Sequence, residues 1–226
     1  ANDKYSRSYQ PGRNDKFAVL TGDVSASSLD YFMRELFHLE SPDDPKVNQL
    51  VVLSPLSPNA AELDVMVKPS YETRVQWFRG SAMDDADLKR IKLTHPNCQA
   101  CFVMVDKNPQ VAEAGGSTEL NASDMSVHRI TMSVSGYSPE LPVYAQSTVS
   151  ANARQLLVSG AHAVSTVEEI KLNMLAMSSA LPGLTTLVSN LLTTIGHQDL
   201  NRLERDLEGR VSDRSWVHEY LTGTSY

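Results

Sequence analysis

The sequence has few cysteines, no long apolar run and no excess of basic residues, and each absence excludes a class of protein. Its 226 residues include only Cys98 and Cys101, too few for a scaffold held by disulfides, so a reducing compartment is expected. The longest uninterrupted apolar run, residues 100–105, is much shorter than the ~20 residues of a membrane-spanning helix. The net charge of −7, from 20 basic and 27 acidic residues, argues against a nucleic-acid partner, because phosphate contacts need a clustered basic surface.

Catalytic motifs are missing as well. The sequence has no nucleophile elbow, no Walker-type phosphate loop and no H-E-x-x-H zinc motif, so an enzyme is not predicted. Cys98 and Cys101 form a C-x-x-C pair, but this pair leads into an apolar run instead of opening a helix, where a thiolate would be stabilised. We therefore expect two core thiols and no redox site.

The first 165 residues alternate between short β-rich runs and amphipathic stretches. This order predicts an α/β fold with a Rossmann-like, doubly wound parallel sheet over residues 16–165. The run at 99–105 is the most apolar and is therefore expected at the centre of the sheet. Strands are expected at 16–21, 49–53, 74–78, 99–105, 142–147 and 161–164, with helices at 25–39, 60–67, 84–91, 118–134 and 150–158.

A nucleotide cofactor is the usual ligand of such a sheet, but the turn after the first strand lacks most of the required glycines. Residues 22–27 read G-D-V-S-A-S, so only Gly22 of the G-x-G-x-x-G pattern is present. Val24 stands where bare backbone must approach the pyrophosphate, and Asp23 adds negative charge where a phosphate would lie. The second strand ends without an acidic residue for the ribose. No NAD-type cofactor is expected.

The chain after residue 165 has a different pattern. Apolar residues at helical spacing form two stripes, one ending at Leu181 and one beginning at Leu184. Proline kinks or ends a helix, so residues 166–196 are predicted to form a helical hairpin with its hinge at Pro182 and Gly183, followed by a small C-terminal segment, residues 197–226. The stripes need a surface that covers them, either the chain's own sheet or another subunit.

Acidic residues gather in two places. Residues 38–44 carry three carboxylates, which could bind a hard cation such as Ca²⁺, and a solvated acidic loop is the alternative because the spacing is not that of an EF-hand. Asp84, Asp85 and Asp87 are expected in the first turn of a helix, where they oppose its dipole.

A series of segments resembles the first RCK domain (regulator of potassium conductance) of BK-type, Slo family potassium channels. No single segment is specific, but their order is, and they cover the chain from about residue 16 to residue 226. The segments are 17–23 (FAVLTGD), 31–38 (YFMRELFH), 56–59 (LSPN), 78–82 (FRGSA), 87–91 (DLKRI), 168–172 (EEIKL), 183–191 (GLTTLVSNL) and 219–221 (EYL).

The resemblance implies a non-enzymatic, cytosolic domain of a membrane-embedded, calcium-activated channel. Residues 1–15 would be the linker that carries force to the pore, and two RCK domains per subunit would assemble into a gating ring beneath a tetrameric pore. A nucleotide- or metabolite-binding Rossmann protein and a ligand-free assembly scaffold are the alternatives. The hairpin would pair with a second RCK domain or a neighbouring subunit through Leu184, Leu187, Val188, Leu191, Leu192 and Ile195.

The resemblance also implies positions for ion sensing. Glu40 and Glu35 fall at acidic positions of a Ca²⁺ site, and His38 falls at a proton-sensing histidine. The second acidic contributor of that site is replaced by Ser215, and a supporting arginine is replaced near Ile195. Ca²⁺ is thus the candidate ion, bound by an incomplete set of residues.

Gln49 and Gln76 stand where the family has two glutamates for Mg²⁺. Neutral amides forfeit most of the affinity for this ion, which favours carboxylates and water. No Mg²⁺ site is therefore expected.

Overall fold

The computed structural model describes residues 4–22, 24–38, 47–105, 117–181, 183–184 and 186–188. Nearly all of these residues belong to the first of two compact units, 1–184 and 185–226. No helix within these described ranges is long and apolar enough to cross a membrane.

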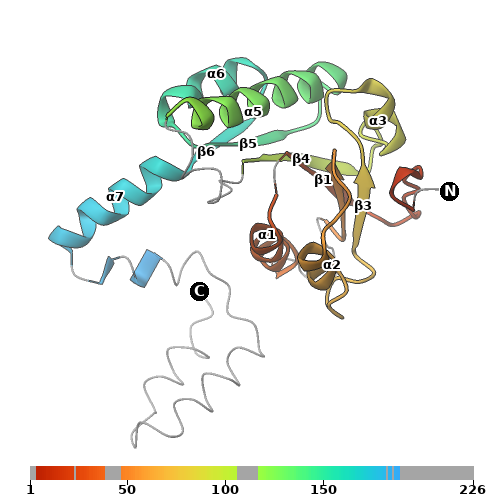
Figure 1. Cartoon of the computed structure of the whole chain (residues 1–226), viewed down its shortest axis with the longest axis horizontal. Coiled ribbons are helices and arrows are strands. Elements are labelled where there is room, and N and C mark those ends of the chain that lie inside the picture. Colours follow the sequence, from red (N-terminus) through yellow and green to blue (C-terminus); the bar gives the residue numbers. More distant parts are fainter. Residues whose placement is uncertain are drawn as a thin grey trace, which may run out of the picture. The chain divides into compact units, whose positions relative to one another are not determined.

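Six parallel strands form one sheet in the order β3-β2-β1-β4-β5-β6 (Figure 1). Chain order reverses between β1 and β4, as in a doubly wound sheet, so the α/β fold predicted from the sequence is confirmed. The apolar run at 99–105 lies in β4, near the centre of the sheet as predicted. The strands are β1 (Phe17–Gly22), β2 (Gln49–Ser54), β3 (Val75–Arg79), β4 (Cys98–Met104), β5 (Val143–Ser147) and β6 (Ala163–Thr166).

Helices cover both faces of this sheet, with α1 and α2 on one side and α3, α5 and α6 on the other (Figure 1). Each helix predicted before residue 165 is present, with ends that differ by a few residues. The helices are α1 (Ala26–His38), α2 (Ala60–Met66), α3 (Asp85–Arg90), α5 (Ser117–Tyr137), α6 (Ala153–Val158) and α7 (Val167–Ala180), with short 3-10 turns η1 (Lys4–Ser6) and η2 (Ser150–Asn152).

The core consists of two hydrophobic clusters, one on each face, because successive strand residues point to opposite sides. In β1, Phe17 and Val19 belong to the cluster that includes Leu88 of α3. Ala18 and Leu20 belong to the other cluster, which includes residues of α1. Burial of the sheet on both faces explains why its strands read as continuous apolar runs.

The two cysteines lie on one face of β4 although they are three positions apart. The register between β1 and β4 shifts beside Cys98, since Phe17 pairs with Cys98 but Ala18 pairs with Ala100. This irregularity brings Cys98 and Cys101 into the same buried cluster. Burial raises the pKa of Cys98 to about 12 and raises that of Cys101 further, so both are neutral core thiols, as the sequence indicated.

Gly22 is the one glycine of the G-x-G-x-x-G pattern that the chain retains, and the packing of β1 against β4 requires a glycine at this position. Its φ is +105°, and a Cβ atom there would lie 2.2 Å from the carbonyl oxygen of Met104. The backbone conformation and the close packing therefore explain why glycine occupies this position, whether or not a nucleotide binds.

We expect Gly22→Ala to lower the free energy of unfolding by at least about 2 kcal/mol, because a side chain at positive φ is strained and meets Met104. Gly136→Ala is the matched control, since its Cβ would meet nothing within 4 Å and alanine favours the helix by about 0.5–1 kcal/mol. Urea unfolding measures both. Equal stability of the two variants would contradict the role of Gly22.

Candidate functional site

Residues 4–9, which lie in the range 1–15 that the sequence assigned to a linker, pack against the lobe beside β3. Tyr9 is only 1% exposed, and its ring centroid lies 4.9 Å from that of Phe17 and 5.9 Å from that of Phe78. Its backbone N–H donates to the carbonyl of Arg90 at 3.0 Å. The described residues before residue 16 are thus part of the lobe, and we call residues 4–9 the strap.

Arg90, the last residue of α3, holds the strap in place. One of its terminal nitrogens, Nη1, donates to the carbonyls of Tyr5 at 3.4 Å and Arg7 at 3.1 Å. The other, Nη2, donates to the carbonyl of Arg79 at 2.5 Å and to Asp87 Oδ1 at 2.6 Å. The planar guanidinium therefore joins the strap, the end of β3 and α3, which a lysine ammonium could not do with the same geometry.

Gly80 makes room for this arrangement. A Cβ atom on Gly80 would lie 2.5 Å from Asp87 Oδ2 and 2.7 Å from Arg90 Nη2. Asp87 Oδ2 also accepts the backbone N–H of Ser81 at 2.8 Å. Asp84 caps α3 by accepting from the N–H of Ala86 at 2.9 Å, which confirms the interpretation of these acids as helix-start residues.

The sequence did not identify Gly80, Asp87 and Arg90 as the residues that hold the strap. Segments 78–82 and 87–91 carried part of the family resemblance, and they supply Gly80, Asp87 and Arg90. The spacing of Asp87 and Arg90 is a local signal for a pair on one helix face. The partners on the strap lie more than 80 residues away and have no local signal.

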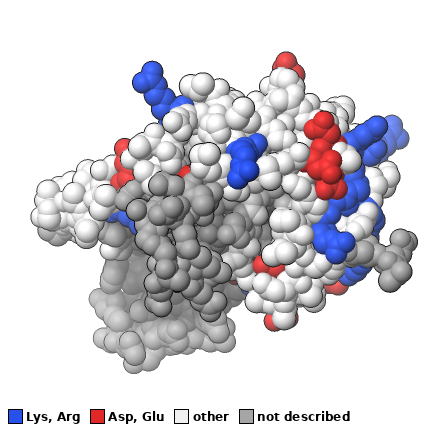
Figure 2. Space-filling model, turned by 45° about the horizontal axis from the view of Figure 1, so that its top comes forward, with Lys and Arg blue, Asp and Glu red and all other residues white. Residues whose placement is uncertain are grey.

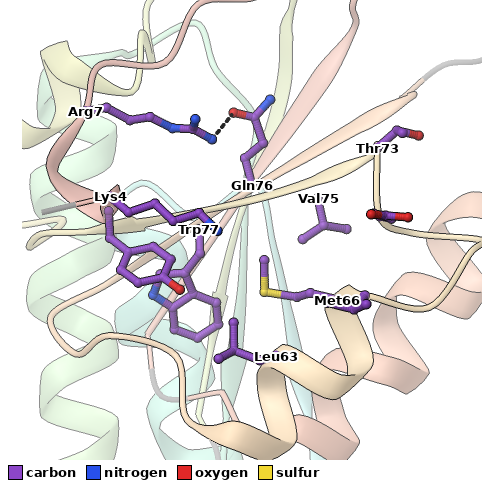
Figure 3. A pocket seen from close by; sticks show the side chains of 11 residues that line it. Lys4, Arg7, Leu63, Met66, Thr73, Val75, Gln76 and Trp77 are labelled. Carbon is purple, nitrogen blue, oxygen red and sulfur yellow. Dashed lines mark hydrogen bonds between the residues drawn. The ribbon is translucent and has the colours of Figure 1, made fainter.

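A pocket of about 480 Å³ lies between the strap, α2 and β3 (Figure 3). Arg7 Nη2 donates to Gln76 Oε1 at 3.3 Å within it. The pocket is lined by Lys4, Tyr5, Arg7, Leu63, Met66, Val67, Glu72, Thr73, Val75, Gln76 and Trp77.

This pocket contains one of the two positions considered for Mg²⁺. Gln76 offers a neutral amide, and its oxygen already accepts from Arg7. Glu72 is the only carboxylate among the lining residues, whereas Lys4 and Arg7 bring positive charge. The residues therefore do not fit a divalent cation, which prefers several oxygen ligands. The other position, Gln49, lies on β2, and its buried side-chain oxygen has no hydrogen-bond partner among the residues that the structure describes.

The residues proposed for ion sensing are only partly within the described ranges. Glu35 lies on α1, where its carboxylate is 3.7 Å from Arg34 Nε. His38 is the last residue of α1, and Glu40 and Ser215 lie outside the described residues. Within the described ranges no group of three or more His, Cys, Asp or Glu residues could hold a metal ion. Ca²⁺ binding and proton sensing remain predictions.

The turn expected to exclude a nucleotide is described except for Asp23. Val24 packs against the hydrophobic cluster on the α1 side of the sheet. Ser25 Oγ accepts the backbone N–H of Ser28 at 3.2 Å, so a serine side chain occupies a helix-start donor that a phosphate would use. The absence of an NAD-type cofactor remains a prediction.

The predicted hairpin begins with α7, which carries a largely exposed apolar stripe. Ile170 is 48% exposed and Met177 is 50% exposed, so the described residues do not bury it. The helix ends at Ala180, and Gly183 has a φ of +88°. Pro182, Leu191, Leu192 and Ile195 lie outside the described residues, so the hinge and the interface remain predictions.

The described part of that interface is only partly covered. Leu187 is 50% exposed, and Leu184 and Val188 are half-buried.

Asp124 is a structural carboxylate that the sequence analysis missed. On α5, its Oδ1 accepts from the N–H and hydroxyl of Thr148 at 3.0 and 2.9 Å, and its Oδ2 accepts from Ser147 Oγ at 2.9 Å and Asn152 Nδ2 at 2.7 Å. Burial alone would raise the pKa of Asp124, but these hydrogen bonds outweigh it and lower the pKa below the ordinary 3.8. The carboxylate joins α5 to the segment after β5.

Comparison with known proteins gives two family matches. Residues 13–145 match the family described as the calcium-activated potassium channel slowpoke-like RCK domain, and residues 162–226 match the calcium-activated BK potassium channel alpha subunit. The calcium-activated potassium channel slo-1 of Caenorhabditis elegans is 27% identical over 226 residues, which cover 97% of this chain and 18% of that protein. The chain therefore spans less than a fifth of this relative.

The fold also matches a solved structure, that of the human SLO3 gating ring. The TM-score is 0.59 at 20% sequence identity, over 89% of this chain and 31% of the other. This likeness supports the fold.

Arg90→Lys tests the attachment of the strap. We expect the free energy of unfolding to fall by about 1.5–3 kcal/mol, because lysine keeps the charge but cannot bond the same carbonyls. Hydrogen exchange at the Tyr9 amide should accelerate relative to amides in β4. Lys89→Gln, at an exposed neighbouring position, is the control and should change neither quantity. Unchanged exchange at Tyr9 in Arg90→Lys would contradict the attachment.

Asp124→Asn tests the buried carboxylate through its pH dependence. Because the folded pKa is depressed, Asp124 stabilises the fold above about pH 4, and this contribution is lost as the pH falls through the folded pKa. The variant should lose about 1–3 kcal/mol at neutral pH, and its difference from the parent should shrink below pH 4. Unfolding curves at several pH values measure this difference, and a constant difference would contradict the assignment.

Proposed function

The chain belongs to the calcium-activated potassium channel slowpoke-like RCK domain family, and from this premise we propose that it is a cytosolic gating-ring domain of a BK-like potassium channel. The resemblance drawn from the sequence is thereby confirmed at the level of the family. The channel as a whole, its permeant ion and its other domains belong to the proposal, since the chain spans 18% of its relative slo-1.

The attachment of the strap to the lobe is the observation that supports a mechanism for this domain. In this proposal residues before Tyr9 lead to the pore, and tension on them acts where the chain is fixed. The strap is fixed by the Arg90 guanidinium and by the buried Tyr9 ring. These two contacts would transfer a movement of the strap to α3 and to the end of β3. A well-fixed attachment is required because a loose strap would extend instead of moving the lobe.

Other RCK domains are the proposed partners of the exposed stripe on α7. An apolar helix face that stays about half exposed in the chain alone gains free energy by packing against a partner. The family model that covers residues 162–226 supports assembly with other parts of a channel alpha subunit.

Ca²⁺ would act on the ring through Glu40 and Glu35, with His38 as a proton sensor, by binding one ring shape more tightly than the other. No catalytic role is proposed.

Electrical recording from the channel that contains this chain tests the proposal. At saturating Ca²⁺, Arg90→Lys should lower the open probability about 5-fold or more, because a loosened strap weakens coupling between ring and pore. Lys89→Gln should behave like the parent. Open probability that is equal in Arg90→Lys and the parent would reject the strap as the coupling element, and a lack of any potassium current would reject the channel assignment.

Calcium titration by calorimetry on the chain, compared with Glu40→Ala, tests the ion site. A heat of binding that is lost in Glu40→Ala supports this site, because removal of a carboxylate ligand weakens Ca²⁺ binding. Equal heats in both proteins would remove Glu40 from the site.

A further inference from the structure

The pocket between the strap, α2 and β3 has no role in the function proposed above. Its volume of about 480 Å³ lies within the range of small-molecule sites, which is roughly 300–1,000 Å³. It is bounded by segments that are far apart in sequence, so its shape depends on the strap being held against the lobe. A ligand there would contact the strap and the lobe at once.

One side of this pocket is apolar and well fixed. Figure 3 shows the Trp77 indole beside Leu63 and Met66. The indole N–H donates to the carbonyl of Leu56 at 3.0 Å, so the ring is held in one orientation and its polar atom is satisfied. Such a surface of indole, thioether and aliphatic groups favours a flat or aliphatic ligand body.

The other side carries excess positive charge. Arg7 donates to the neutral amide of Gln76, and its guanidinium carbon lies 5.9 Å from the centroid of the Phe78 ring, so neither of these two partners is an anion. Among the residues that the structure describes, no ion pair joins Lys4 or Arg7 to a carboxylate, and Glu72 is the only acid in the lining. In Figure 2, basic and acidic side chains lie close together at the end of the lobe that carries α3 and the N-terminal residues. The pocket itself has two cations against one anion.

We infer that this pocket binds a small amphipathic carboxylate, with its apolar body against Trp77 and Met66 and its carboxylate beside Lys4 and Arg7. A divalent cation does not fit the donors, as shown above. Inorganic phosphate would leave the apolar side unused, and a neutral apolar molecule would offer no anionic group to Lys4 and Arg7.

The ligand would also fix the strap. Arg7 would contact it through the side chain while its carbonyl stays bonded to Arg90. A ligand that binds only the docked strap shifts the equilibrium towards that state. This regulatory consequence rests on the proposed function, whereas binding itself does not.

Naphthoate and its neutral isostere naphthamide are the test probes, added to the whole chain and followed by calorimetry and NMR. Naphthoate should bind with a dissociation constant in the millimolar range or tighter, perturb the Trp77 indole N–H resonance and bind more weakly as salt increases. Naphthamide should bind at least about 5-fold more weakly, because it has no charge to interact with Lys4 and Arg7. Equal binding of the two probes, or no change at Trp77, would overturn the inference.

Lys4→Gln and Arg7→Gln should each weaken naphthoate binding several-fold and leave naphthamide unchanged. Both side chains are exposed at the pocket mouth, so neither substitution should unfold the chain. Lys89→Gln removes one positive charge outside the pocket and should bind naphthoate like the parent. If Lys89→Gln weakens binding as much as Lys4→Gln, the effect reflects net charge and the site is rejected.

Electrical recording of the channel in the presence of naphthoate distinguishes this inference from the proposed function. Naphthoate applied to the cytosolic side should change the open probability of the parent channel, and Lys4→Gln should need a several-fold higher concentration for the same change. Binding to the chain without any effect on the channel would support the pocket and count against the strap as the coupling element.

Discussion

The guanidinium of Arg90 is the contact on which the outer part of this lobe depends. It bonds carbonyls of the strap and of β3 and pairs with Asp87 at a side-chain exposure of about 20%. Partial burial strengthens these charge-assisted bonds relative to a solvated ion pair. Without them, Tyr9 would keep its ring contacts and its backbone bond to the Arg90 carbonyl, but the strap residues that close the pocket beside Trp77 would lose their bonds to α3.

The sheet and its helices could be predicted from the sequence because their signals are local. The run at 99–105 is apolar throughout because β4 is covered on both faces, and the helix ending at Ala180 follows from the stripe before Pro182. The register shift beside Cys98 could not be predicted, since pairing between β1 and β4 decides it. A regular strand would place Cys98 and Cys101 on opposite faces.

The candidate site was harder to predict than the fold because it is built from distant segments. Tyr9 lies in a polar stretch and gave no sign of burial, whereas the structure places its ring against Phe17 and Phe78. Asp124 has no local signal of burial in the sequence, because its hydrogen-bond donors come from residues more than 20 positions away. Conversely, Gly22 suggested part of a nucleotide motif, but its close approach to Met104 explains it fully.

The placement of both cysteines on one face of β4 has a practical consequence. Each thiol is shielded by the same cluster, and neither is ionised at neutral pH. Reagents that modify thiolates can therefore reach them only when the centre of the sheet separates from α3 and α5. The rate at which such reagents modify Cys98 and Cys101 therefore measures how often the interior opens, and no label has to be introduced.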